Sequence, residues 1–211
     1  RSDGWTELTG GAKTSTFDMK GFWQSATSDA VDVEAFPDLA VANRAHTMGP
    51  AETETEPAYL WHAGRFKYEL LGAYNELAPF TLGSQGTDGV GVVKGQLAKE
   101  KGTVSATGAL GSGVNLGAGG AGKFLYATLH AFAVGTTITV QVQSDADNTF
   151  ASATTVATFT AVTARGGSWL PRVDATSITD TWFRLNVSAI SEDSSSPPNT
   201  SSSISTMPGG M

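Results

Sequence analysis

The chain has 211 residues, of which 40% are hydrophobic and 16% charged, and it contains no cysteine. The missing cysteine excludes a disulfide scaffold, a thiolate zinc site and a cysteine nucleophile. The formal net charge of −7 argues against the broad basic surface that nucleic acid binding requires. No apolar run approaches the roughly 20 residues that a membrane-spanning helix needs.

In chain order, the sequence predicts an N-terminal arm (1–13), one β-domain (14–190) and a Ser- and Pro-rich tail (191–211). Alternation of period two dominates the domain and is typical of half-buried strands. The expected strands are residues 14–23, 58–71, 89–98, 103–108, 114–116, 124–134, 136–144, 154–163, 167–172 and 182–189. This pattern favours an all-β fold, a sandwich or barrel of antiparallel strands.

Helix is expected only as one or two short elements. One lies near residues 31–43, where Pro37 would interrupt a longer helix. The tail, residues 191–211, cannot bury a core, and we expect it to be exposed and ordered only where a neighbour holds it.

Two strands have distinctive faces. In residues 136–144, apolar side chains alternate with the uncharged polar residues Thr137, Thr139, Gln141 and Gln143. Residues 124–134 are apolar on both faces, one of which carries Phe124, Tyr126, His130 and Phe132. Both faces of such a strand are buried, or it is an inner strand at an interface.

A glycine-rich segment, residues 117–123, has the spacing of phosphate-binding loops, although Phe124 replaces the Ser or Thr that would hold Mg²⁺. Such loops require a helix to follow, and here the sequence predicts a strand. We therefore interpret the segment as a flexible strand connection.

Other candidate sites have simpler explanations. His46, His62 and His130 could form a metal site, but single histidines on strands are more often packing residues. The segment Asp145–Asn148 lacks the glycine and glutamate of a calcium loop and predicts an Asx turn. The alternating acids Glu52, Glu54 and Glu56 resemble a glycosidase pair, but between Pro50 and Pro57 they are expected to be solvated. We expect no catalytic, metal or cofactor site, and no enzyme.

Tryptophan and arginine share strand faces at two places. Trp61 lies on one predicted face with Arg65 and Lys67, and Trp182 lies with Arg184. Because Trp and Arg are enriched at protein contacts, these residues are a candidate subunit interface. Arg stacked on Trp within one domain is the alternative.

Residues 122–145, GKFLYATLHAFAVGTTITVQVQSD, resemble a recurrent segment of the major tail (tail tube) proteins of long-tailed double-stranded DNA bacteriophages. The segments 157–164 and 178–184, with Trp169 between them, resemble the same family, and upstream residues 19–23 and 58–63 occupy the expected order. The resemblance covers roughly residues 14–190. The chain departs from the family at its start, where another strand is usual, and at its Ser/Pro-rich end.

The resemblance implies a structural virion protein, made in the host cytoplasm and located in the phage tail. Family members form β-sandwich or barrel subunits whose hexameric rings stack into a hollow tube that conducts DNA. The implied partners are copies of the chain and other tail proteins, with DNA passing through unbound and no membrane. A negative wall suits such a conduit, because it repels a polyanion. Residues 122–134 and 136–144 become the candidate inner strands.

Two other functions stay open. The protein could be a virion decoration protein, or a carbohydrate-binding jelly roll that uses exposed tryptophans as sugar platforms. The second requires Trp61, Trp169 or Trp182 to converge in one groove.

An acidic insertion, residues 29–57, is far longer than the median connection of about 4–6 residues. Its candidate contact residues are Asp29, Asp32, Glu34, Phe36, Asp38, Leu39, Glu52, Glu54 and Glu56. We expect it to reach the adjacent ring, where its acids meet bases such as Arg65, Lys67, Lys94, Lys99 or Lys101. The alternative is a solvated loop that touches nothing.

Overall fold

Nearly all regular structure is antiparallel β, as the sequence predicts. The computed structural model describes residues 15–23, 31–41, 43–70, 78–87, 89–133, 137–191 and 199–208. Within them, the only helix is α1 (Val31–Ala35), which ends directly before Phe36 and Pro37, as expected. No helix of the described residues is long and apolar enough to cross a bilayer.

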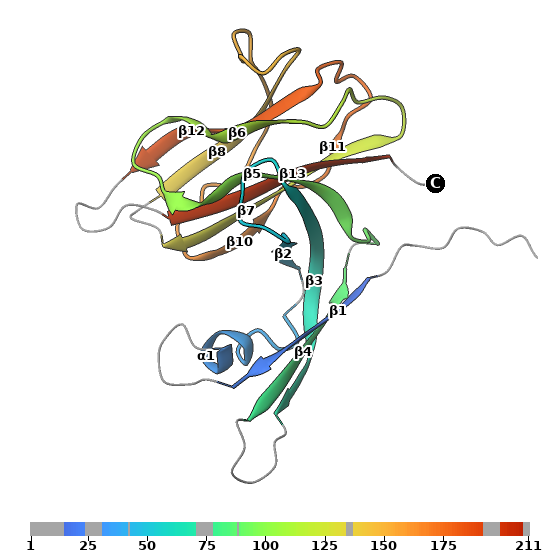
Figure 1. Cartoon of the computed structure of the whole chain (residues 1–211), viewed down its shortest axis with the longest axis vertical. Coiled ribbons are helices and arrows are strands. Elements are labelled where there is room, and N and C mark those ends of the chain that lie inside the picture. Colours follow the sequence, from blue (N-terminus) through green and yellow to red (C-terminus); the bar gives the residue numbers. More distant parts are fainter. Residues whose placement is uncertain are drawn as a thin grey trace, which may run out of the picture.

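The strands form two sheets (Figure 1). In spatial order, the larger sheet contains β1 (Thr16–Phe22), β4 (Pro79–Gly86), β3 (Pro57–Leu70), β5 (Val93–Thr103), β13 (Asn199–Pro208), β7 (Lys123–Ala133) and β10 (Gly166–Trp169). In addition, β2 (Arg44–Met48) pairs with β3, and β11 (Val173–Asp174) pairs with β7. The smaller sheet has the order β6 (Gly108–Asn115), β12 (Trp182–Ser191), β8 (Thr137–Asp145) and β9 (Thr154–Thr158).

The main hydrophobic core lies between the smaller sheet and the strands β5 and β7. Leu125 and Leu129 of β7 face Val140 of β8 and Leu185 of β12 in one buried cluster. The predicted alternation of β8 is confirmed, because its even-numbered side chains are buried while Thr137, Thr139, Gln141 and Gln143 are half-buried. In β12 the alternation holds as far as Val187, after which a bulge turns Ala189 outward.

The second face of β7 is covered by strands of its own sheet. The hydroxyl of Thr128 on β7 lies 2.8 Å from that of Thr47 on β2. The ring of Tyr126 lies 5.9 Å from that of Trp169 on β10, which stacks on His62 of β3 at 5.2 Å. The large sheet therefore curls so that β2 and β3 pack against β7 and β10. The two-faced burial predicted for this strand is confirmed for residues 125–129, but Phe132 is 44% exposed.

The two candidate inner strands do not pair with each other. Strands β7 and β8 belong to opposite sheets, and β8 pairs with β12 and β9. Tyr126 is only 2% exposed, because it packs against Trp169 within the chain. Of the other residues named on these strands, Phe132 on β7 is exposed, while the polar face of β8 is half-buried.

The prediction for the tail needs correction. The backbone of residues 199–208 forms β13, which pairs with β5 along one edge and with β7 along the other. Pairing on both edges satisfies the backbone hydrogen-bonding groups without any hydrophobic pattern, so a Ser- and Thr-rich segment can occupy a central position in the sheet. The predicted N-terminal arm, 1–13, and residues 192–198 and 209–211 of the tail lie outside the described residues.

One part of the large sheet extends away from the sandwich. There the second half of β3 pairs with β4, β4 pairs with β1, and α1 lies beside them (Figure 1). We call residues 16–23, 31–41, 64–70 and 78–86 the arm. Its exposed large hydrophobic residues are Met19, Phe22, Trp23, Val33, Phe36, Phe66 and Leu70.

Candidate functional site

The three histidines lie on neighbouring strands, and each packs against a specific partner. His46 on β2 stacks on Trp61 with a centroid distance of 5.3 Å, and His62 stacks on Trp169. Nε2 of His130 lies 2.9 Å from the Thr47 hydroxyl. Among the described residues no group of His, Asp and Glu side chains is arranged to hold a metal ion.

Burial keeps two of these histidines neutral. It lowers the pKa of His46 to about 4, with the positive charge of Arg65 as the next cause. Burial also lowers the pKa of His130 to about 4. At neutral pH His46 therefore acts as a packing group and His130 as a hydrogen-bonding group.

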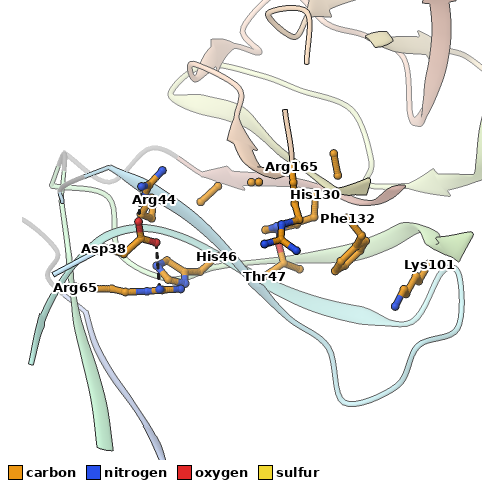
Figure 2. Close-up of a pocket in the computed structure, with 13 residues that line it drawn as sticks. Asp38, Arg44, His46, Thr47, Arg65, Lys101, His130, Phe132 and Arg165 are labelled. Atoms are coloured by element: carbon orange, nitrogen blue, oxygen red, sulfur yellow. Dashed lines mark hydrogen bonds and ion pairs between the residues drawn. The ribbon is translucent and has the colours of Figure 1, made fainter. Parts of the chain in front are cut away.

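An open cleft of about 780 Å³ lies beside these histidines, and we call it the basic cleft. Among the described residues, its charged lining consists of four cations, Arg44, Arg65, Lys101 and Arg165, and one carboxylate, Asp38. Figure 2 shows Asp38 with Arg44 and Arg65 at one end and Lys101 at the other. A second hollow of about 530 Å³ adjoins it and shares Lys101 with it.

Asp38 holds one end of the cleft together. One carboxylate oxygen pairs with Arg44, and the other accepts a hydrogen bond from Arg65 at 3.1 Å. The sequence offered no signal for this cluster, because Arg65 comes from β3 and Asp38 from the segment that follows α1. Arg65, predicted to contact a neighbouring subunit, therefore has an acidic partner within its own chain.

The acidic insertion is largely tied to its own chain rather than extended. It contains α1 and β2, and β2 pairs with β3. Asp32 accepts a hydrogen bond from the Tyr68 hydroxyl at 2.8 Å, and the backbone of Leu39, which is half-buried, bridges to Arg65. Phe36 stays 62% exposed. Asp29 and the side chain of Glu34 lie outside what the structure describes.

Glu54 anchors the end of the insertion. Its carboxylate accepts hydrogen bonds from the Ser112 hydroxyl at 2.6 Å and from Lys99 at 3.2 Å. Burial alone would raise the pKa of Glu54, but these bonds, the Lys99 charge and the backbone N–H of Glu100 together lower it. Glu54 was expected to be solvated and Lys99 to meet a neighbour's acid, yet the two pair within the chain.

The predicted Trp–Arg interface is wrong at Trp61. This side chain is only 4% exposed, packed between His46 and Phe17, whose ring lies 4.8 Å away. A β-bulge between Arg65 and Lys67 interrupts the period of two, and Phe66 at the bulge is 56% exposed.

The other residues of that prediction contact their own chain. Lys67 pairs with Glu69 at 3.0 Å on an exposed surface. Arg184 donates a hydrogen bond to Gln143 and lies over the Phe150 ring, 4.5 Å from its centroid. Trp182, half-buried, pairs through its backbone with β6 and β8.

The glycine-rich segment and the predicted Asx turn behave as expected. Strand β7 begins at Lys123, so no helix follows the glycines, and Lys123 donates a hydrogen bond to the Ala118 carbonyl. Asp147 accepts hydrogen bonds from the backbone N–H and the hydroxyl of Thr149.

Neither a scan against models of known protein families nor a search of curated proteins finds a match to this chain.

Proposed function

We propose that this protein is a structural subunit that assembles with copies of itself into stacked rings and forms the hollow tail tube of a long-tailed DNA bacteriophage. In this proposal it performs no catalytic step. The rings, hexameric in the family that the sequence resembles, enclose a lumen through which DNA passes without specific binding.

The arm is the observation that carries the proposal. Its seven exposed large hydrophobic residues lie on or directly after β1 and α1 and in the second half of β3, outside the sandwich core. Exposed apolar surface of this kind usually marks an interaction site. Among the described residues β1 pairs only with β4, so its outer edge offers unpaired backbone groups to another strand. An apolar surface next to an open edge is what a repeating assembly can cover.

Two further observations support a structural role. The net charge of −7 suits a conduit for DNA, since a negative wall does not retain a polyanion. The carbohydrate-binding alternative loses support, because Trp61 is buried and Trp169 is stacked on His62. Neither ring is an open platform for a sugar.

Sedimentation of two variants tests the proposal. Phe22→Ser combined with Phe66→Ser removes two side chains that are 60% and 56% exposed, so the variant should fold normally but sediment as a monomer. Val92→Ser, at a 45% exposed position outside the arm, is the matched control and should assemble like the unmodified chain. Normal assembly of the Phe variant would refute a role for the arm in self-association.

A further inference from the structure

The basic cleft is a concentration of positive charge on an acidic chain. Four cations and one carboxylate line it, whereas the whole chain has a net charge of −7. Asp38 is already shared by Arg44 and Arg65 at one end. The lowered pKa of His46, to which the Arg65 charge contributes, is consistent with a positive potential here.

The far end of the cleft combines charge with apolar surface. Lys101 is exposed, and its ammonium lies 4.9 Å from the centroid of the Phe132 ring, which is itself 44% exposed. Arg165 lies between Lys101 and the Asp38 cluster (Figure 2). Arginine and lysine at the wall of a recessed site suit a carboxylate, which accepts two hydrogen bonds in one plane.

The acidic segment 50–57 has the complementary chemistry. Glu54 fixes the middle of the segment through Ser112 and Lys99, while Glu52 and Glu56 on either side of it are exposed. Glu52 also lines the second hollow, next to Lys101 of its own chain, but among the described residues the structure records no ion pair for Glu52 or Glu56. Because Glu54 anchors the backbone, Glu52 and Glu56 lose less freedom on binding than they would on a flexible loop.

We infer that the basic cleft is a binding site for the carboxylates of an acidic segment, and that a second copy of this chain supplies them through Glu52 and Glu56. This inference rests on the proposed self-assembly and assigns it a polar contact. A nucleic acid fits less well, because phosphate binding needs cations along an extended footprint and the surrounding chain is acidic.

Peptide binding by the full chain tests the site directly. A fluorescently labelled peptide with the sequence of residues 50–57 should bind, and its form with all three glutamates changed to glutamine should bind about tenfold more weakly or worse, a loss of about 1.4 kcal/mol. Lys101→Glu should cause a similar loss, whereas Lys94→Glu, at an exposed position on β5 outside the cleft, should not. Equal binding of the two peptides, no binding, or stronger binding of a short DNA duplex would overturn the inference.

Charge exchange tests the same contact within the assembly. Lys101→Glu with Arg165→Glu, and separately Glu52→Lys with Glu56→Lys, should each weaken assembly, and combining all four changes in one chain should restore it. If the unmodified chain assembles and all these variants assemble equally well, the cleft contact is refuted, but the proposed function is not. Unmodified chain that stays monomeric would refute the proposed function, and peptide binding would then decide whether the cleft binds carboxylates.

Discussion

Replacing Glu54 with glutamine tests whether the acidic insertion is anchored to its own chain. The carboxylate accepts hydrogen bonds from Ser112 at 2.6 Å and from Lys99 at 3.2 Å, and the two side chains of the ion pair are only 20% and 18% exposed. Charge-assisted hydrogen bonds contribute about 1.5–3 kcal/mol each, and partial exposure screens them. We therefore expect Glu54→Gln to lower the free energy of unfolding by about 1–2 kcal/mol. For a chain of this size, each kcal/mol lowers Tm by roughly 2–4 °C.

The matched control is Glu52→Gln, two residues away on the same segment. Glu52 is exposed, so its substitution should change the free energy of unfolding by less than about 0.5 kcal/mol. Both variants are compared with the unmodified chain by urea denaturation of dilute protein, so that assembly does not contribute. Equal stability of the two variants would refute the anchoring role of Glu54.

The pH dependence of this difference has a defined sign. The pKa of Glu54 is lowered in the folded chain from its ordinary value of 4.5. The stabilisation is therefore complete above pH 4.5 and is lost as the pH falls through the folded pKa. The gap between unmodified chain and Glu54→Gln should narrow in acid, and a gap that stays constant there would show that the charge is not its cause.

Three further outcomes are expected. The pKa of about 4 for His46 and His130, against an ordinary 6.5, should lower stability as the pH falls from 6.5 towards 4, by roughly 3 kcal/mol for each ring, and His130→Gln should flatten this profile in thermal melts. Gly111→Ala should destabilise the fold by about 2 kcal/mol or more in urea melts, because φ is +74° and a Cβ would lie 2.1 Å from the Ala98 carbonyl oxygen, whereas Gly102→Ala should be mild. Trp61→Ala should lower monomer stability by about 3–5 kcal/mol, and a stable variant that fails only in assembly would restore Trp61 as an interface residue.

The strands that could be predicted from the sequence are those in which the polarity of each side chain matches its burial. Strands β8 and β12 alternate between core and surface, so their burial follows from the pattern alone. Residues 125–129 of β7 could also be predicted as buried, because a run that is apolar on both faces is usually covered on both. The residues that cover its second face could not be predicted from the sequence, because Thr47 and Trp169 belong to strands that are distant in the sequence.

The elements that sequence reasoning missed are held by pairing rather than by pattern. Strand β13 carries no apolar periodicity and is defined by backbone hydrogen bonds to β5 and β7. Strand β2 lies within the acidic insertion, where its five residues show no clean alternation. The bulge in β3 interrupts the alternation at Phe66, and a local irregularity of this kind has no reliable sequence signal.

The candidate site was the least predictable part. Asp38, Arg165 and Lys101 reach the basic cleft from a loop after α1, the turn before β10 and strand β5. Each is unremarkable in its own sequence context, so only the curled sheet reveals their proximity. The charge of the acidic insertion is evident in the sequence. The pairing of Asp38 and Glu54 with basic residues of the same chain is evident only in the fold.

Electron microscopy of the purified full chain over a range of concentrations tests the central claim most directly. Self-assembly through the arm predicts hollow tubes of stacked rings, with the arm residues Phe22 and Phe66 covered at contacts between subunits. A population that remains compact monomers at every concentration, with the edge of β1 and the arm still exposed, would contradict it.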